Sequence, residues 1–310
     1  MADFASQLLK LQNTAQHVRK RKLDEVSIKD EAEGDVLKLM ERKRKELQGF
    51  ELDFLCIGAQ KAGTTWLHDM LNQHASSHVV LPKEVKEVHF WDWNRDKGLL
   101  WYKNQFRVKR DGQICGEINP CYSVLPEKDV EEIKLLFPNL KLIFIARSIF
   151  DRTWSAMIMK LRQNLLGLAP GEFANSTGGK AANLDFKEQY QSYSDEYFLN
   201  EMHTLTHRSR SDYNAFLRVW LKYFDSKSIL IIDYEEISKN PQKVLDRFCS
   251  HLGLPKVVAP ATSLKRRINV GQPISVREGV KDDLQNLTSK YVRDFNTLLK
   301  ELGCDWRLHD

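Results

Sequence analysis

Three short apolar runs, each followed by a stretch with helical spacing, constrain the fold of this chain more than any other feature. The runs span residues 54–57, 141–146 and 228–233. The helical patterns behind them begin at Thr65 and span 150–162 and 241–252. Continuous apolar runs are typical of strands buried on both faces, and parallel strands need helical connections. The sequence therefore predicts an α/β fold, with a central parallel β-sheet flanked by helices.

Residues 1–50 differ from the rest of the 310-residue chain. They contain no proline, two glycines, and basic runs at 19–22 and 42–45. Helical spacing of apolar residues predicts one or two helices that pack on the core or on a partner, as in a homo-oligomer. Interleaved acidic residues favour a solvated helix face over a site for nucleic acid or anionic lipid. We expect a helical N-terminal extension over 1–50 and a single domain over 51–310.

Residues 164–183 interrupt the alternation of strands and helices. They contain four glycines and a proline, and their only basic residue is Lys180. A long Gly-rich stretch inside an α/β domain is typical of a functional lid or a disordered insertion. We expect a flexible lid or acceptor loop there. The helical pattern resumes over 195–225, and an amphipathic helix is expected near 281–302.

Composition and charge bound the partners and the compartment. A net charge of +5 is mild, which disfavours a dedicated nucleic-acid binder but suits a small polyanionic ligand held by a local positive site. The N-terminus lacks a secretory signal pattern, and no run of 18 apolar residues exists, so no membrane partner is expected. The five cysteines are widely spaced without a CxxC pair, which favours reduced thiols. Together these features predict a cytoplasmic protein.

The first chemical signal is the loop Gly58–Thr65, with the sequence GAQKAGTT, between a predicted strand and a predicted helix. That geometry directs backbone N–H groups and the positive end of the helix dipole at an anion. Gly63 lets the backbone approach closely, Lys61 adds a positive charge, and Thr64 adds a hydroxyl. The loop therefore predicts a phosphate-binding site. A glycine-rich turn without a ligand is the alternative.

The loop departs from the Walker A pattern. Lys61 lies two positions before Gly63, whereas a Walker A lysine directly follows the last glycine. No later strand ends in an obvious acidic residue that would hold magnesium. A P-loop kinase or nucleotidase is therefore an alternative of lower weight.

A second anchor follows the run 141–146. Arg147 would lie at the carboxyl edge of the sheet, where open α/β sheets bind ligands, and Ser155 lies about two helical turns further on. An arginine fork and a hydroxyl suit a second phosphate. In the alternative, Asp151 and Arg152 form surface pairs and Ser155 only faces a neighbour. Two anchors on successive strand ends favour a nucleotide with anionic groups at two places.

The pairing of G-x-x-K-x-G-T-T with R-x-x-x-D-R-x-x-S resembles the sulfotransferases that use 3′-phosphoadenosine 5′-phosphosulfate (PAPS). The similarity covers about residues 52–302 and implies a P-loop-type domain that releases the bisphosphate PAP. In that family the loop holds the 5′-phosphosulfate, and the arginine and serine hold the 3′-phosphate. The implied donor-binding residues are Lys61, Ala62, Gly63, Thr64, Thr65, Trp66, Arg147 and Ser155. A basic loop at 265–272 adds Arg267 and Asn269, unless it is only an exposed charge run.

The segment 86–93, KEVHFWDW, resembles the carbohydrate branch of that family, which modifies heparan-type chains. The resemblance implies that Glu87 is the catalytic base and that Lys61 stabilises the leaving nucleotide. In an extended segment His89 points to the same face as Glu87, so either could take the proton of an attacking hydroxyl. Aromatic residues nearby either line an acceptor pocket or pack in the core; the candidates for the pocket are Phe90, Trp91 and Tyr122.

One departure from the carbohydrate branch bears on the acceptor. The branch has a lysine after the glutamate of its EK-[ST]-P-x-Y segment, and Ile118 follows Glu117 here. Loss of that cation favours a small hydroxylated acceptor, as in natural-product tailoring, over a sulfated polysaccharide. A carbohydrate O-sulfotransferase and a non-catalytic nucleotide-binding scaffold remain as alternatives. We expect no metal requirement, because lysine and arginine offset the charge of the donor.

Overall fold

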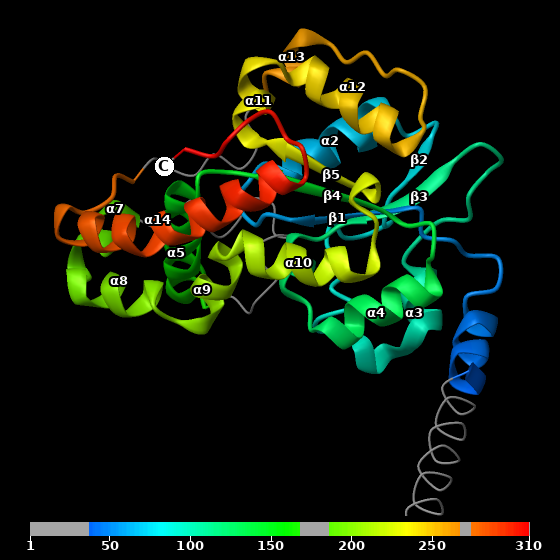
Figure 1. Cartoon of the computed structure of the whole chain (residues 1–310), viewed down its shortest axis with the longest axis horizontal. Helices are drawn as coiled ribbons and strands as arrows, with labels where there is room; N and C mark the ends of the chain where they lie inside the picture. The colour runs from blue at the N-terminus through cyan, green and yellow to red at the C-terminus, as the bar shows by residue number, and fades with distance from the viewer. Residues whose placement is uncertain (1–36, 168–185, 267–273, 310) are drawn as a thin grey trace, which may run out of the picture. The chain divides into compact units, whose positions relative to one another are not determined.

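The computed structural model describes residues 37–167, 186–266 and 274–309, which fall into two compact units, Met1–Gln48 and Gly49–Asp310. In the first unit, residues 37–46 are helical (Figure 1). A helical extension was predicted over 1–50, and its part from residue 1 to residue 36 lies outside the described residues. Among the helices described in either unit, none is long and apolar enough to cross a bilayer.

The second unit is built on a five-stranded sheet whose order is β2-β3-β1-β4-β5. All four strand pairs are parallel, and β1 lies in the middle, with Phe54 in register with Gly116 on one side and Lys141 on the other. This sheet confirms the predicted α/β class. The strands are β1 (Phe54–Gly58), β2 (Val79–Val80), β3 (Ile114–Ile118), β4 (Lys141–Ala146) and β5 (Ile229–Asp233).

Helices cover the sheet on both faces; Figure 1 shows α2 and α12 above it in this view, and α4 and α10 below. The α-helices are α2 (Thr64–His74), α3 (Gly98–Asn104), α4 (Glu127–Leu136), α5 (Ile149–Leu165), α7 (Phe186–Ser192), α8 (Asp195–Met202), α9 (Leu205–Ser211), α10 (Tyr213–Tyr223), α11 (Tyr234–Lys239), α12 (Pro241–Leu252), α13 (Ala261–Leu264) and α14 (Glu278–Glu301). Short 3-10 turns are η1 (Arg95–Lys97), η2 (Pro120–Val124) and η4 (Ser226–Ser228).

The elements follow from local sequence. Strands β1 and β4 are apolar runs buried on both faces, as parallel strands require. Helix α12 has Pro241 in its first turn, where the missing N–H costs nothing, and ends at Gly253 in the left-handed conformation. Strands β2 and β3 escaped the sequence pattern, because β2 has two residues and β3 carries a glycine and Glu117 within its apolar run.

An apolar cluster lies among the helices α5, α7, α8 and α14 (Figure 1). Its members include Trp154 and Leu161 of α5, Phe198 of α8 and Leu284 of α14. The stretch predicted as helical over 195–225 forms three helices, and the last of them begins where Asp212 accepts a hydrogen bond from the backbone N–H of Ala215. Most of the predicted lid at 164–183 lies outside the described residues.

Candidate active site

The loop Gly58–Thr65 connects the carboxyl end of β1 to the first turn of α2. The N–H of Ala59 donates to the carbonyl of Ile145 at the end of β4, 2.9 Å away, which holds the loop at the carboxyl edge of the sheet. Gly63 has φ +82°, and a Cβ on it would lie 3.1 Å from both Tyr234 and Ile237. A side chain would be strained and crowded at this position, which favours glycine, and the N–H groups of the first turn of α2 lack helical partners and are available to an anion.

Arg147 reaches this loop from the end of β4. Its Nη1 donates to the carbonyl of Lys61 at 2.9 Å, and its guanidinium lies 5.1 Å from the ring centre of Tyr234. Its Nε is buried without a hydrogen-bond partner among the described residues, as expected of a side chain that awaits an anion. Ser155 is half-buried in the second turn of α5.

Positive charge is concentrated around Lys61. Burial lowers the pKa of Lys61 from 10.5 to about 8, and the charges of Arg147, Arg162 and Lys86 act in the same direction, against Glu87. A bound anion would relieve this repulsion and keep Lys61 charged. The residues present therefore fit a polyanionic nucleotide such as the donor that the sequence implied.

Residues 86–93 form the acceptor segment, and its first four residues lie in neither a helix nor a strand. Hydrogen bonds from backbone N–H groups hold the segment in place. The N–H of Val88 donates to Glu117 Oε1 at 3.0 Å. The N–H groups of Phe90 and Trp91 donate to the hydroxyl of Tyr122 at 2.9 and 3.4 Å, and that hydroxyl donates to Glu117 at 3.0 Å. These bonds fix the segment above β3 without using the side chains of Glu87 or His89.

The aromatic residues predicted either for the acceptor pocket or for the core lie in the core. Phe90 and Trp91 are each 1% exposed, and Tyr122 is fully buried. Phe90 stacks on Tyr102 with ring centres 4.7 Å apart, and Trp91 meets the same ring edge-on at 6.1 Å. Their placement favours the packing alternative.

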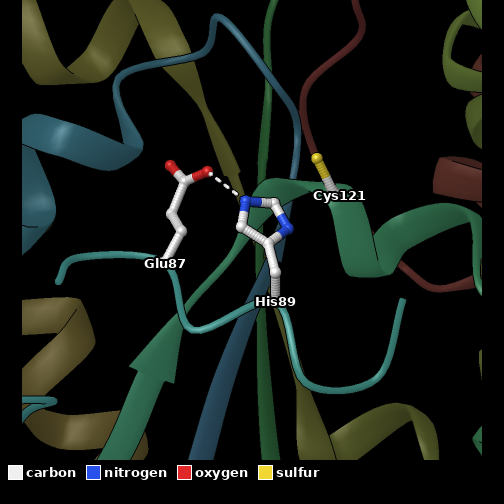
Figure 2. Close-up of side chains that lie close together, drawn as sticks. All are labelled: Glu87, His89 and Cys121. Carbon is white, nitrogen blue, oxygen red and sulfur yellow. Dashed lines mark ion pairs between the residues drawn. The ribbon is translucent and has the colours of Figure 1, made fainter. Parts of the chain in front are cut away.

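The two candidate bases face each other, as Figure 2 shows. Glu87 Oε2 lies 3.4 Å from His89 Nε2, and His89 Nδ1 lies 2.9 Å from Asp92 Oδ2. The imidazole also stacks on Trp93, with ring centres 3.6 Å apart. Asp92 and Trp93 therefore orient His89, which in turn contacts Glu87.

Lys86 links the acceptor segment to the donor loop. Its Nζ lies 2.6 Å from Glu87 Oε1 and 3.3 Å from the hydroxyl of Thr64. A single ammonium group thus contacts the candidate base and the predicted phosphosulfate loop. The two predicted half-sites are therefore adjacent.

The charges on the pair are set by their neighbours. Burial alone would raise the pKa of Glu87, but Lys86 and His89 outweigh it and lower that pKa to about 2. Burial alone would lower the pKa of His89, but the hydrogen bond to Asp92 and the ion pair with Glu87 outweigh it and raise that pKa to about 9. At neutral pH the pair is a carboxylate against an imidazolium.

Two of the three residues predicted as catalytic have unusual backbones. Lys61 (φ +70°) and His89 (φ +55°) are the non-glycine residues with positive φ in the described parts of the chain. Such conformations cost free energy and persist where the surrounding structure imposes them, often at functional sites. Their occurrence at these two positions supports a shared site.

Cys121, which follows β3, completes a cluster with Glu87 and His89 (Figure 2). One ligand atom from each lies within 4.8 Å of the others, and such donors can bind zinc. However, cationic Lys86 contacts Glu87, and Arg210 Nη2 lies 3.5 Å from Cys121 Sγ. These positive charges oppose the binding of a dication at the cluster. Metal-free catalysis stays a prediction.

The other predicted donor residues have varied outcomes. Trp66 is buried and donates its indole N–H to the carbonyl of Leu264 at 3.1 Å, which ties α2 to α13. Arg267 and Asn269 lie outside the described residues. Sequence reasoning missed Lys86, Asp92 and Arg210 as site residues. The first two lie beside predicted residues, within the segment already singled out, but nothing in the sequence pointed to Arg210.

A family profile described as a sulfotransferase domain matches residues 51–268. Heparan sulfate glucosamine 3-O-sulfotransferase 3B1 of Homo sapiens is 27% identical over 206 residues, which are 66% of this chain and 46% of that protein. Bifunctional heparan sulfate N-deacetylase/N-sulfotransferase 4 of Mus musculus is 28% identical over 211 residues, 65% of this chain and 22% of that protein. The chain thus matches less than half the length of these curated relatives.

Among solved structures, a sulfotransferase from Alicyclobacillus acidocaldarius is similar with a TM-score of 0.56. The similarity covers 83% of this chain and 97% of that chain, at 20% sequence identity. At that identity the likeness concerns the fold.

Proposed function

The chain belongs to the sulfotransferase domain family, and we propose that it transfers the sulfuryl group of PAPS to a hydroxyl of a small-molecule acceptor and releases PAP. One observation carries this proposal. The Lys86 ammonium contacts both Thr64 of the donor loop and Glu87 of the acceptor segment. Donor sulfur and acceptor hydroxyl would therefore meet at Lys86.

The reaction needs positioning and charge stabilisation. The acceptor oxygen bonds to sulfur while the bond from sulfur to the bridging oxygen of the donor breaks, and that electron pair leaves with PAP. The hydroxyl proton passes to Glu87. Lys61 and the first-turn N–H groups of α2 stabilise the charge that develops on the leaving oxygen.

We assign the base to Glu87, because a pKa of about 9 keeps His89 protonated at neutral pH. With a pKa of about 2, Glu87 is a poor proton acceptor while Lys86 contacts it. A sulfonate bound beside Thr64 would compete with Glu87 for the Lys86 ammonium. Loss of that contact raises the pKa of Glu87 when the donor is in place, so donor binding activates the base.

For the acceptor we propose a small hydroxylated molecule, of the kind modified in natural-product tailoring. Ile118, buried at the end of β3, stands where the carbohydrate branch has a lysine. A carbohydrate hydroxyl is the second candidate, since the relatives reported above are named as heparan sulfate enzymes. A cytoplasmic location stays a prediction.

Ligand-dependent melting tests the nucleotide, with PAP compared against ATP plus magnesium. We expect PAP to raise the melting temperature by several degrees without magnesium, because it binds the folded state alone, and Lys61→Ala to abolish the shift. Greater stabilisation by ATP and magnesium would instead indicate a P-loop kinase or nucleotidase. Transfer from radiolabelled PAPS to a panel of alcohols, phenols and sugars then tests the reaction. PAP binding without transfer to any of them would indicate a scaffold.

A further inference from the structure

Arg210 lies in the last turn of α9, and hydrogen bonds of the neighbouring residue hold this end of the helix in place. The hydroxyl of the next residue, Ser211, accepts from Arg152 Nη2 at 2.8 Å and lies 3.0 Å from the hydroxyl of Thr153. All three of these residues are buried. The base of the Arg210 side chain is therefore held by a packed polar network joining α9 to α5.

The guanidinium of Arg210 is half-buried and touches only neutral groups among the described residues. Its Nη1 lies 3.4 Å from Gln60 Oε1, and its Nη2 lies 3.5 Å from Cys121 Sγ. Burial raises the pKa of the Cys121 thiol to about 12, so this sulfur carries no charge at neutral pH. No carboxylate of the described residues forms an ion pair with Arg210, so these contacts leave the charge of the guanidinium without a counter-charge.

Arg210 lies close to the proposed base. The 3.5 Å contact with Cys121 Sγ and the 4.8 Å limit between that sulfur and Glu87 place the guanidinium and the carboxylate at most about 8 Å apart. One small molecule can therefore contact both groups through hydrogen bonds of ordinary length. A hydroxyl beside Glu87 and an acid group on Arg210 can therefore belong to one small acceptor.

We propose that Arg210 binds an acid group of the acceptor, so that the preferred substrates are small hydroxy acids; this proposal rests on the proposed function of the site. The planar fork of arginine suits a carboxylate, and its present partners are a neutral amide oxygen and a thiol, which a charged group would displace. The donor has its own cations in Lys61, Lys86 and Arg147. Arg210 reaches the donor loop only through the Gln60 side chain among its described contacts.

Matched acceptor pairs test this proposal. Mandelate, 3-hydroxybutyrate and salicylate are each compared with the corresponding primary amide, by transfer from radiolabelled PAPS and by calorimetric binding to the protein–PAP complex. We expect the acids to be favoured about 10- to 100-fold in kcat/KM or Kd, because hydrogen bonds between charged groups are lost with the amide. Arg210→Gln should remove the preference, and Arg210→Lys should restore part of it. Arg208→Gln, on the exposed side of the same helix, is the control.

The outcomes separate this proposal from the one on which it depends. Equal use of acids and amides, a preference that survives in Arg210→Gln, or no binding of any acid while PAP still binds would overturn the role of Arg210. A weaker affinity of Arg210→Gln for PAP would assign the residue to the donor and also overturn it. If the wild-type protein did not bind PAP, the proposed function itself would be wrong.

Discussion

The donor side and the acceptor side of the site are built in different ways. On the donor side, the loop Gly58–Thr65 provides backbone N–H groups and Lys61 within eight consecutive residues. On the acceptor side, Glu87 and His89 come from one irregular segment, and tertiary packing brings Arg210 of α9 and Cys121 close to them. A site formed by backbone groups requires only that one turn adopt a defined conformation. A site formed by side chains from distant segments requires that the whole domain be folded.

The two sides also differ in charge. Lys61 is surrounded by further cations, whereas Glu87 is already paired with Lys86 and His89. In the proposed function, the donor side would attract an anion directly, and the acceptor side would become reactive only after its internal pairing changes. Substitutions that separate binding from chemistry test this difference.

Lys61→Ala should have the largest effect, because it removes the charge that stabilises both the bound donor and the leaving oxygen. We expect kcat/KM for transfer to fall by about 10³-fold or more, with weaker PAP binding measured by calorimetry. Lys83→Ala, at an exposed lysine of the chain, should leave both unchanged. Near-normal transfer by Lys61→Ala would remove the donor side from the proposed site.

Glu87→Gln should separate the two sides most clearly. Without a proton acceptor, kcat should fall by about 10²- to 10³-fold, while the Kd for PAP stays within about twofold. The control is Glu84→Gln, at an exposed carboxylate of the same stretch. If the Glu87 variant turned over acceptor at the wild-type rate, another group would have to be the base.

Asp92→Asn should act through His89, lowering kcat by about tenfold with little effect on KM for PAPS. The raised pKa of His89 also makes stability pH-dependent. Its contribution is fully present below pH 6.5 and is lost as pH rises to about 9. In Asp92→Asn the pKa of His89 is lower, so the variant lacks part of this contribution at pH 6. The free energies of unfolding of the wild type and the variant should therefore differ by about 1–2 kcal/mol less at pH 9.5 than at pH 6. Urea unfolding measures it, and a pH-independent difference would contradict the role of Asp92.

Tyr122→Phe should have the smallest effect on transfer. The change removes the hydroxyl that accepts from the N–H groups of Phe90 and Trp91 and donates to Glu117. The loss of these hydrogen bonds costs about 1–3 kcal/mol of stability. Transfer by the folded fraction should change less than about twofold. A large fall in kcat with unchanged stability would instead return Tyr122 to the acceptor pocket.

The limits of prediction from the sequence follow the same division. Strand β4 and helix α12 were predicted with their observed bounds, because each has an unbroken pattern and distinct ends. Arg147 was expected at the carboxyl edge of the sheet, but its contact with the carbonyl of Lys61 needed the folded chain. Arg210 was not expected at the site, because it lies 150 residues from Gln60 in a helix with no chemical motif. Pairing Glu87 with His89 needed only local spacing, but the Lys86 contact with Thr64 needed the folded chain.

The way in which the acceptor segment is held has a consequence for diversification. The N–H groups of Val88, Phe90 and Trp91 anchor it to Glu117 and Tyr122, and any residue except proline supplies such a group. The residues that face the substrate can therefore be exchanged while their mounting stays in place. Exchange of the side chain at position 87, as in Glu87→Gln, would therefore alter the chemistry of the site and leave these main-chain bonds in place.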